Sequence, residues 1–345
     1  MSVEAVPATM RRVVVGEDGV RVVTVETPVP GPNEALVRVV VAGICGSDTH
    51  AMHGRHPFIT LPYLPGHEVS GVVVGGTVLP IGQRVTVEPF LPCWNCKQCL
   101  AGRQNICENL TFFGCVHDQG GMADYFTLDV RRLHAVPDEL DWMTAALIEP
   151  LATPVHATRL AGDLRGKAVA ILGAGTIGLL MLRVARAHGA ARIVMTARSQ
   201  TNRDRALTFG ADAAVDASAP DAIEQVRAAL GESADVVFDC VTDERTMAQA
   251  IGMANKGGTV VVVGVPAGEV PIPLQTIQDS QIRIQGSATY LPEDYADSME
   301  LLRKGVVTAA DFITGTRPLA EAAAAFADAD SGRHIKVLLT GREGD

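Results

Sequence analysis

The sequence contains no apolar run that reaches the roughly 18 to 20 residues of a membrane-spanning helix. Its first residues, MSVEAVPATMRR, also lack the apolar core of a signal peptide. Positive charge is not in excess, because the formal net charge is -10, and this argues against nucleic acid or an anionic membrane as a partner. We therefore expect a cytoplasmic protein whose partner is a small molecule.

Internal repeats and low-complexity tracts are absent as well. The chain has 345 residues, for which about two domains are expected. Hydrophobic residues make up 47% and charged residues 20%, a balance that fits a soluble globular enzyme and excludes a disordered chain.

A glycine-rich segment near the middle of the chain has the pattern of strand, tight turn and helix. The apolar run Ala168–Leu172 is followed by Gly173, Gly175 and Gly178 in GxGxxG spacing and then by the apolar stretch Leu179–Ala187. At such a turn the backbone can approach a pyrophosphate closely, and the amino end of the helix favours the anion. The pattern predicts a dinucleotide site, although a glycine-rich turn without a ligand has the same spacing.

Further apolar runs of strand length follow at Arg192–Thr196, Ala234–Phe238 and Thr259–Val263, separated by helical spacers. This alternation predicts a doubly wound α/β domain with a parallel sheet, from about residue 155 to residue 288. The later segment RIQGSATYLPEDYADSMELLRKG predicts a last strand and a helix that begins near Pro292.

The amino-terminal region is rich in β-strand signals. A hairpin is expected around Asp18-Gly19, and a valine-rich strand over Ala35–Val41. The segment LAEAAAAFADADSGRHIKVLL near the carboxyl end predicts a helix and a strand that return to this first region.

Four of the seven cysteines are crowded into CWNCKQCLAGRQNIC, and cysteines of a cytosolic protein rarely form disulfides. Four thiolates suit a closed structural zinc site, and an iron–sulfur cluster is the alternative with the same ligand count. The ligands are Cys93, Cys96, Cys99 and Cys107. Cys115 and Cys240 lie outside this group, and we expect both to be buried free thiols.

A second set of metal-ligand residues is spread along the chain next to apolar structure. Cys45 follows a predicted strand, His67 and Glu68 precede another, and Glu149 stands in IEPLATPVHA. Thiolate, imidazole and carboxylate form the ligand set of an open zinc site, which leaves a position for water or substrate.

The chain resembles the zinc-containing medium-chain dehydrogenases of the alcohol, polyol and threonine dehydrogenase group. The resemblance covers nearly the whole length and is carried by GICGSDTH, GHEVSG, the four-cysteine lobe, EPLA and GAGTIG, in that order. It implies an α/β protein with a GroES-like, β-rich catalytic domain over residues 1–154 and 289–345, including a structural zinc lobe at about 90–110. A Rossmann dinucleotide-binding domain would occupy residues 155–288.

The resemblance also implies roles for residues. Cys45 and His67 would hold a catalytic zinc together with a glutamate, for which Glu68 and Glu149 are both candidates. The metal would acidify an alcohol, Ser47 and His50 would pass its proton to solvent, and hydride would go to the nicotinamide. His53, His56 and His117 have no place in the motif and are expected on the surface or in loops. The family commonly forms homodimers or homotetramers.

The second strand of the dinucleotide domain departs from the pattern of proteins that prefer NAD. Ala197 stands where an acidic residue would bind the ribose hydroxyls, and Arg198, Ser199 and Arg203 follow. Loss of the acid together with the gain of arginines predicts NADP(H). The complete set of predicted cofactor-binding residues is Thr153, Gly173, Gly175, Thr176, Ile177, Gly178, Ala197, Arg198, Ser199 and Arg203.

The substrate is less well defined by the sequence. Thr289-Tyr290 replaces the Arg-Tyr pair of sorbitol-type members, and Ala51 replaces a larger residue. We therefore predict a zinc-dependent NADP(H) alcohol or polyol dehydrogenase acting on a secondary alcohol, a vicinal diol or the corresponding ketone. The alternatives are a non-catalytic NADP-binding zinc protein, an NAD-dependent threonine- or sorbitol-type dehydrogenase, and a quinone-reductase-like member without catalytic zinc.

Overall fold

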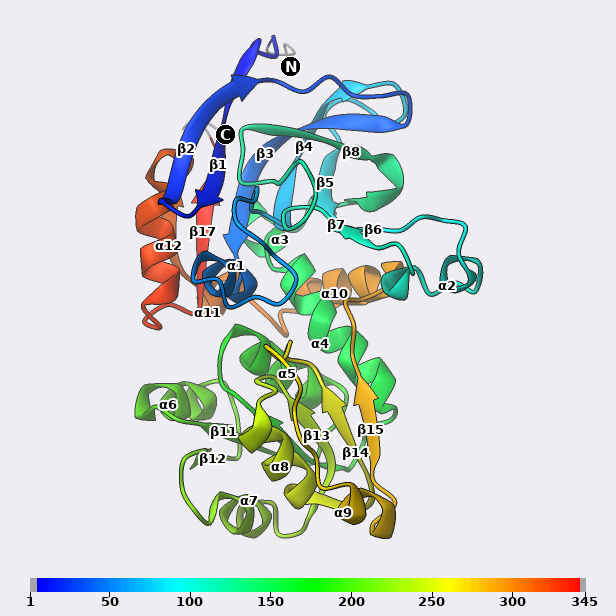
Figure 1. The fold of residues 1–345 in the computed structure, drawn as a ribbon, viewed down its shortest axis with the longest axis vertical. Helices are drawn as coiled ribbons and strands as arrows, with labels where there is room; N and C mark the ends of the chain where they lie inside the picture. Colours follow the sequence, from blue (N-terminus) through cyan, green and yellow to red (C-terminus); the bar gives the residue numbers. More distant parts are fainter. Residues whose placement is uncertain (1–4, 342–345) are drawn as a thin grey trace. The chain divides into compact units, whose positions relative to one another are not determined.

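The structure, a computed structural model, describes residues 5–341. Residues 1–4, part of the segment that lacks a signal-peptide core, lie outside the described residues. The chain divides into two compact units, one formed by Met1–Pro150 and Leu291–Asp345 and the other by Leu151–Tyr290 (Figure 1).

The second unit is built on a six-stranded sheet in which every strand pair is parallel. The strand order is β12-β11-β10-β13-β14-β15, which is 3-2-1-4-5-6 when the six strands are counted along the chain. This is the order of dinucleotide-binding domains and confirms the predicted doubly wound fold. The strands are β10 Ala168–Leu172, β11 Arg192–Ala197, β12 Ala213–Asp216, β13 Ala234–Asp239, β14 Ala254–Val262 and β15 Arg283–Gly286. The short strand β12 was not predicted.

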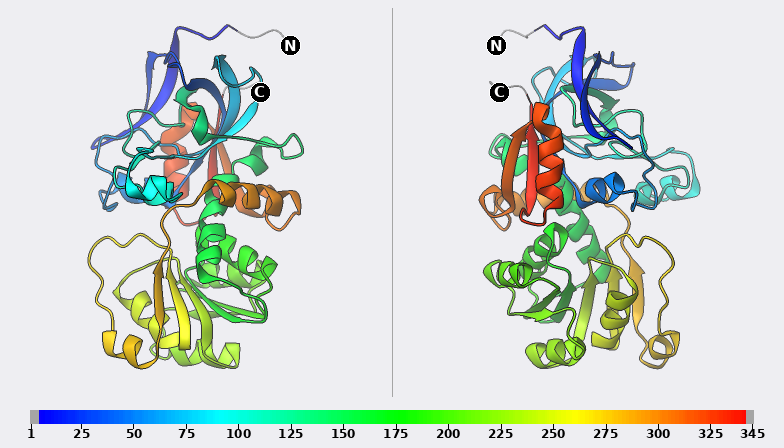
Figure 2. Two further views of the ribbon diagram at one scale, coloured as in Figure 1. Left: turned by 90° about the vertical axis from the view of Figure 1, so that its right-hand side faces the viewer. Right: turned by 60° about the vertical axis from the view of Figure 1, so that its left-hand side comes forward.

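Helices lie on both faces of this sheet (Figures 1 and 2). Burial on both faces explains why the central strands are almost continuously apolar, with Val194, Val237 and Val260 fully buried. The helices are α5 Thr176–Ala187, α6 Gln200–Thr208, α7 Ala222–Leu230, α8 Glu244–Met253 and α9 Leu274–Asp279. Helix α4 spans Ile148–Ala161. Its first three residues belong to the first unit, and the rest of the helix, from Leu151, belongs to the second.

The first unit contains a seven-stranded sheet of mainly antiparallel strands in the order β16-β17-β3-β4-β5-β9, with β8 also paired to β3. Pairing of β17 with β3 confirms that the last strand returns to the amino-terminal region. The strands are β3 Glu34–Ile44, β4 Glu68–Gly76, β5 Arg84–Val87, β8 Tyr125–Asp129, β9 Leu133–Ala135, β16 Ile313–Pro318 and β17 Lys336–Thr340.

The remaining strands of the first unit form two small antiparallel pairs. Strands β1 Thr9–Gly16 and β2 Gly19–Glu26 form the predicted hairpin, and Gly19 takes a φ of 101° at its turn. Strands β6 Phe90–Leu91 and β7 Thr111–Phe112 pair on either side of the four-cysteine lobe. That lobe contains α2 Lys97–Leu100 and the 3-10 helix η1 Gln104–Ile106.

Several short helices and one longer helix complete this unit. They are α1 Gly46–Met52, η2 Val130–Arg132, α3 Trp142–Ala145, α10 Pro292–Arg303, α11 Ala309–Phe312, η3 Leu319–Glu321 and α12 Ala322–Asp330. Helix α10 begins where the sequence predicts, because Pro292 is at its start and the Asp294 carboxylate accepts the Leu291 N–H at 2.7 Å.

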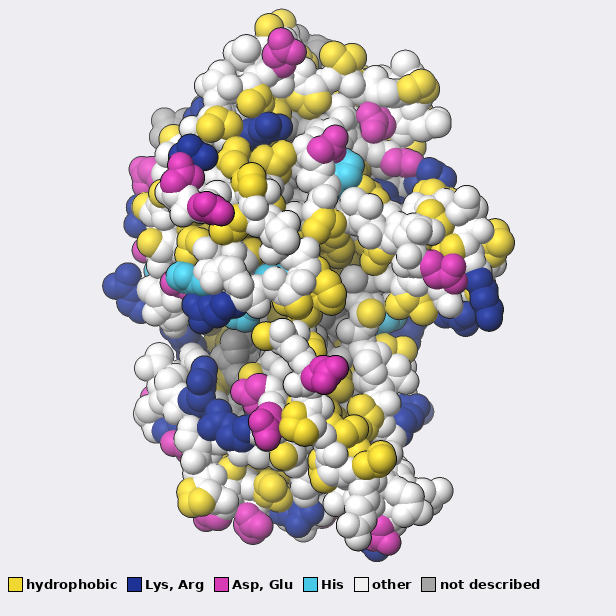
Figure 3. Space-filling view, in the orientation of Figure 1, with side chains coloured by type: hydrophobic (Ala, Val, Ile, Leu, Met, Phe, Trp, Pro, Cys, Tyr) yellow, Lys and Arg dark blue, Asp and Glu magenta, His cyan; other side chains and the backbone are white. Residues whose placement is uncertain are grey.

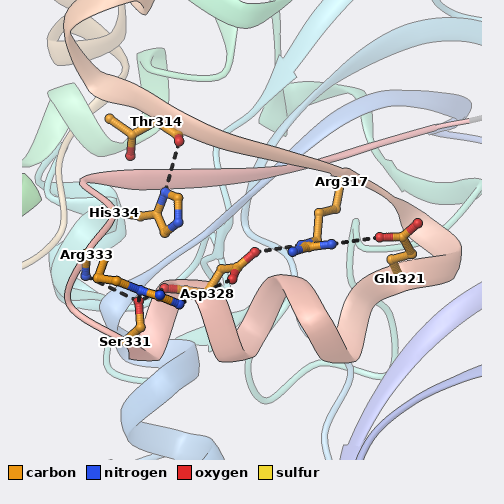
Figure 4. Close-up of polar contacts among 7 residues, drawn as sticks. All are labelled: Thr314, Arg317, Glu321, Asp328, Ser331, Arg333 and His334. Atoms are coloured by element: carbon orange, nitrogen blue, oxygen red, sulfur yellow. Dashed lines mark hydrogen bonds and ion pairs between the residues drawn. The ribbon is translucent and has the colours of Figure 1, made fainter.

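Helix α12 packs beside β17 and β16 (Figure 2). Arg317 of β16 donates from Nε to Asp328 of α12 at 2.6 Å and from Nη1 to Glu321, the residue before α12, at 2.9 Å (Figure 4). This polar network ties the last helix of the chain to the edge strand of the sheet.

Acidic and basic side chains lie interspersed on the face drawn in Figure 3. Within residues 5–341, no helix is both long enough and apolar enough to cross a membrane.

Candidate functional site

Three neighbouring strands of the first unit bring chemically active side chains to one edge of its sheet. Gly43 of β3 pairs with Glu68 of β4, and Ile44 of β3 pairs with Val337 of β17. Cys45 follows directly after β3, while Glu68 and Lys336 are the first residues of their strands. The register therefore gathers residues that are far apart in the sequence.

Cys45, His67 and Glu68 offer ligand atoms that all lie within 4.8 Å of one another. The side chains of His67 and Glu68 are buried, and Cys45 is partly exposed. Glu149 lies in the first turn of α4 and is also buried. Sulfur, imidazole nitrogen and carboxylate oxygen fit a zinc ion with one position open.

Gly43 is required for the position of Glu68. A Cβ atom at Gly43 would lie 2.1 Å from Oε2 of Glu68. Only glycine leaves room for the carboxylate to lie across β3 at this point.

Helix α1 carries the two predicted proton-relay residues. Its start is held by Asp48, whose Oδ2 accepts the Cys45 N–H at 2.9 Å and whose Oδ1 accepts the Tyr63 hydroxyl at 3.1 Å. Ser47 Oγ lies 3.5 Å from Nε2 of His67, and His50 is exposed one turn further along the helix. Burial raises the pKa of Asp48, opposed by the nearby His67 and by the Cys45 N–H.

Lys336 is a buried member of the site that sequence reasoning missed. Its Nζ lies 2.6 Å from both carboxylate oxygens of Glu68 and donates to the carbonyl of Ile44 at 3.0 Å. Burial alone would lower the pKa of Lys336, but Glu68, and further Cys45 and Glu149, raise it above its usual value. The available signal was a lysine at the start of the apolar strand IKVLL, where a charge needs a partner.

Cys115 is the second member that was missed. The sequence predicts a buried free thiol, and Cys115 is buried, but its Sγ also lies 3.6 Å from Nδ1 of His67. The imidazole therefore lies between Ser47 on one side and the Cys115 thiol on the other.

The four-cysteine lobe brings its sulfur atoms into one cluster, also within 4.8 Å of one another. Cys107 Sγ lies 3.4 Å from Cys93 Sγ and 3.9 Å from Cys96 Sγ. Zinc bound tetrahedrally to sulfur at about 2.3 Å requires sulfur atoms about 3.8 Å apart, so these distances fit. The backbone N–H of Asn95 is the main group that lowers the pKa of Cys93 to about 6, whereas burial raises that of Cys99 to about 12.

The glycine-rich turn of the second unit has the geometry of a phosphate-binding loop. Gly173 has a φ of 97°, and Gly175 is the N-cap of α5, which begins with Thr176 and Ile177. A Cβ at Gly178 would lie 2.0 Å from the carbonyl oxygen of Gly173, so the helix can approach the turn only with glycine here.

The residues predicted to select NADP(H) differ in their surroundings. Ala197 is buried at the end of β11, whereas Arg198 and Ser199 are exposed and the Ser199 hydroxyl accepts the Asn202 N–H at 3.3 Å. Arg203 donates from Nη1 to the carbonyls of Ala197 and Arg198, at 3.0 and 2.8 Å.

Nη1 of Arg203 also lies 3.2 Å from Oδ2 of Asp216, a residue of the neighbouring strand β12 that pairs with Ala197. Its guanidinium is therefore engaged within the chain. The guanidinium of Arg198 has no hydrogen bond or ion pair among the residues that the structure describes. Thr153 lies half-buried in α4.

Comparison with known proteins adds two family matches. Residues 31–138 match the family described as Alcohol dehydrogenase GroES-like domain, and residues 176–304 match Zinc-binding dehydrogenase.

Similar individual proteins cover most of the chain. The "Probable D-xylulose reductase A" of Aspergillus clavatus is 36% identical over 92% of each chain. The L-galactonate-5-dehydrogenase of Escherichia coli K12 is 37% identical over 86% of this chain and 87% of its own. A crystal structure of a Sinorhizobium meliloti 1021 protein bound to NADP is 34% identical, covers 97% of this chain and 100% of that one, and superposes with a TM-score of 0.88.

Proposed function

The chain belongs to the family of zinc-binding dehydrogenases with a GroES-like alcohol dehydrogenase domain, and from this we propose that it is an NADP(H)-dependent polyol dehydrogenase. It interconverts a secondary alcohol or vicinal diol and the corresponding ketone. The relatives named for a xylulose reductase and a galactonate dehydrogenase support a polyhydroxylated substrate.

One observation carries this proposal: the ligand atoms of Cys45 and His67 lie within 4.8 Å of each other beside the hydroxyl of Ser47. A protein that kept the fold for a structural task would have no need of this constellation. Bound zinc supplies Lewis-acid chemistry, which makes an alcohol easier to deprotonate and polarises a ketone.

The proton is moved by the chain's own residues. Ser47 lies next to His67, where its hydroxyl can accept a proton from the substrate. His50 lies three residues later on α1, so it is on the same side of the helix and can release the proton to solvent. Histidine is the side chain that most often carries out such proton transfer in enzymes.

Of the two candidate glutamates, we assign Glu149 as the third metal ligand. Glu68 is near enough, but both its oxygens are occupied by Lys336 at 2.6 Å. Glu149 is buried, and its charge contributes to the raised pKa of the same lysine. Glu68 then keeps Lys336 neutralised behind the metal site.

The cofactor assignment depends on Arg198. Because Ala197 removes the acidic residue that would repel a 2′-phosphate, and the Arg198 guanidinium has no partner within residues 5–341, we assign Arg198 and Ser199 to that phosphate. Arg203 holds the carbonyls of Ala197 and Arg198 and so shapes the loop. The relative solved with NADP supports this choice.

The test is steady-state oxidation of NADPH, with NADH alongside, across ketones, ketoses and aldehydes, on protein whose zinc content has been measured. Turnover with NADPH and about two zinc ions per chain are expected. Replacing His67 with Ala should remove one zinc and abolish turnover. An active His67→Ala variant, or zinc-loaded protein that turns over no member of the panel, would contradict the proposal.

A second candidate is an NAD-dependent dehydrogenase with the same substrates. Asp216 favours it, because this carboxylate ends the neighbouring strand β12 and stands opposite Ala197. The ratio of kcat/KM for NADPH and NADH decides between the two cofactors in the same experiment.

A further inference from the structure

The ring of His67, a predicted zinc ligand, has a polar partner at each of its two nitrogen atoms. Nε2 lies 3.5 Å from Oγ of Ser47, and Nδ1 lies 3.6 Å from Sγ of Cys115. Ser47 stands two residues after the other predicted ligand, Cys45, at the start of α1. Nε2 therefore faces the end of α1 that carries Cys45, whereas Nδ1 faces the Cys115 thiol.

Cys115 belongs to a tight turn whose backbone packs directly on that of His67. The carbonyl of Phe112 accepts the N–H groups of residues 115–117, at 3.2, 3.0 and 3.1 Å in that order. Gly114 has a φ of 75°, and a Cβ atom there would lie 2.8 Å from the backbone nitrogen of His67. Only glycine allows this close approach, so the turn fixes the place of the Cys115 side chain.

The surroundings of the Cys115 thiol are apolar. The residue is 8% exposed and belongs to the hydrophobic core of the first unit. Within residues 5–341, Nδ1 of His67 is the only hydrogen-bond partner of its sulfur. The ring of Phe112 stands edge-on to the His67 ring, with 5.7 Å between the ring centroids. A ring N–H of His67 left without an acceptor in such surroundings would cost free energy.

A histidine that binds zinc through one nitrogen usually donates its other N–H to a carboxylate, a backbone carbonyl or water. The two carboxylates beside His67 are engaged elsewhere. Asp48 accepts the Cys45 N–H at 2.9 Å and the Tyr63 hydroxyl at 3.1 Å, and both oxygens of Glu68 are bound by Lys336. Sulfur is a weaker acceptor than oxygen but can accept an N–H, and it is the atom that lies at Nδ1.

We propose that Cys115 is a positioning residue of the catalytic zinc site, whose sulfur accepts the Nδ1–H of His67 and so directs Nε2 to the metal. The inference rests on the proposed function, in which Cys45 and His67 bind zinc. The hydrogen bond fixes the tautomer, because a neutral ring with its proton on Nε2 has no lone pair there for a metal. It also fixes the rotation of the ring. Cys115 remains a thiol and acts through His67 rather than as a ligand.

Nitrogen-15 labelling of the histidine rings allows His67 to be observed directly, because the four-cysteine cluster contains no histidine. The ring signals of His67 are identified by their absence from a His67→Gln variant. Zinc-loaded protein is titrated with the chelator dipicolinate, and the response of these signals measures the zinc affinity of this site alone.

The variants are chosen to separate hydrogen bonding from packing. Cys115→Ala removes the acceptor, whereas Cys115→Ser replaces the thiol with a hydroxyl that can accept the same N–H. Cys240→Ala is the matched control, because it removes a thiol that lies outside both metal groups. Thermal unfolding of each variant identifies any loss that comes from misfolding.

In the zinc-loaded parent protein we expect Nδ1 of His67 to carry the proton and Nε2 to bind the metal. Loss of the hydrogen-bond partner behind a ligating histidine lowers metal affinity about tenfold to a hundredfold. Because sulfur is a weak acceptor, Cys115→Ala should weaken zinc binding at His67 by about tenfold, the lower end of that range. Cys115→Ser should recover most of this loss, and Cys240→Ala should bind zinc as the parent protein does.

Zinc bound to Nδ1 in the parent protein would overturn the inference, and this observation needs no variant. An unchanged zinc affinity in Cys115→Ala would overturn it as well. Equal losses in folded Cys115→Ala and Cys115→Ser would show that the sulfur acts as a ligand or through packing, which also contradicts the proposal. All three outcomes leave the dehydrogenase function standing. If the His67 signals of the parent protein do not respond to zinc, the proposed function and this inference fail together.

Discussion

Nζ of Lys336 lies 2.6 Å from both carboxylate oxygens of Glu68, although 268 residues separate the two along the chain. Both side chains are buried, with 3% and 0% of their surfaces exposed. Removing one partner of such a pair leaves an uncompensated charge in a medium of low dielectric, whereas removing both can be nearly neutral. Replacing only one residue of this pair should therefore destabilise the first unit.

Lys336→Met should lower the free energy of unfolding by about 3 to 5 kcal/mol, because Glu68 remains buried without a cation. Urea denaturation of the metal-loaded protein measures the change. The double variant Lys336→Met with Glu68→Gln should recover most of the loss, since no buried charge then remains. If the double variant loses as much free energy of unfolding as the two single variants lose together, the two residues act independently.

Cys96→Ser tests the four-cysteine cluster. Because Cys96 Sγ lies 3.9 Å from Cys107 Sγ within the cluster, we expect the zinc content to fall by about one ion per chain and the melting temperature to fall with it. The folded fraction should keep its turnover, as the cluster offers no open position. Cys240→Ser, outside both metal groups, should keep the zinc content unchanged. Full zinc content in Cys96→Ser would contradict the structural zinc assignment.

The sequence reveals the parts of the site that are locally encoded. Gly173, Gly175 and Gly178 stand in one turn, and the alternation of apolar runs with helical spacers predicts the doubly wound sheet around them, although not its strand order or the short strand β12. Cys45 and His67 stand next to strands that could be recognised from their valines. Short-range patterns of this kind were enough to predict the fold class and the candidate ligands.

Lys336 and Cys115 could not be found in this way, because their relation to His67 and Glu68 arises from strand register and loop packing. Lys336 meets Glu68 only because β17 and β4 both pair with β3. Cys115 reaches His67 from the loop after β7, where no periodic pattern exists. The sequence likewise could not show that Arg203 is bonded within its own loop, whereas the Arg198 guanidinium has no partner in the part of the chain that the structure describes.

Ala197→Asp combined with Arg198→Ala should shift the preference from NADP toward NAD. The new carboxylate would accept the ribose hydroxyls and repel a 2′-phosphate, and the loss of one arginine contact corresponds to about a tenfold to hundredfold change in affinity. The measurement is the ratio of kcat/KM for NADPH and NADH. Arg203→Ala is the matched comparison, and it should weaken both cofactors together because Arg203 holds two carbonyls of the loop. An unchanged ratio in the double variant would place the phosphate elsewhere.

Asp328 should contribute stability that depends on pH. The Nε–H of Arg317, which donates to its carboxylate at 2.6 Å, lowers the pKa of Asp328 below its ordinary value (Figure 4). A carboxylate whose pKa is depressed in the folded state stabilises the fold above the unfolded value of about 3.9, and the contribution disappears as the pH falls through the folded value. Asp328→Asn should therefore lower the urea concentration at the midpoint of unfolding at pH 7. The difference between the midpoints of the variant and the parent protein should become smaller below about pH 3.9. Asp279→Asn, at the exposed end of α9, should leave the midpoint unchanged at both pH values. A gap of the same size at both pH values would show that the substitution acts through packing, with no role for the ion pair.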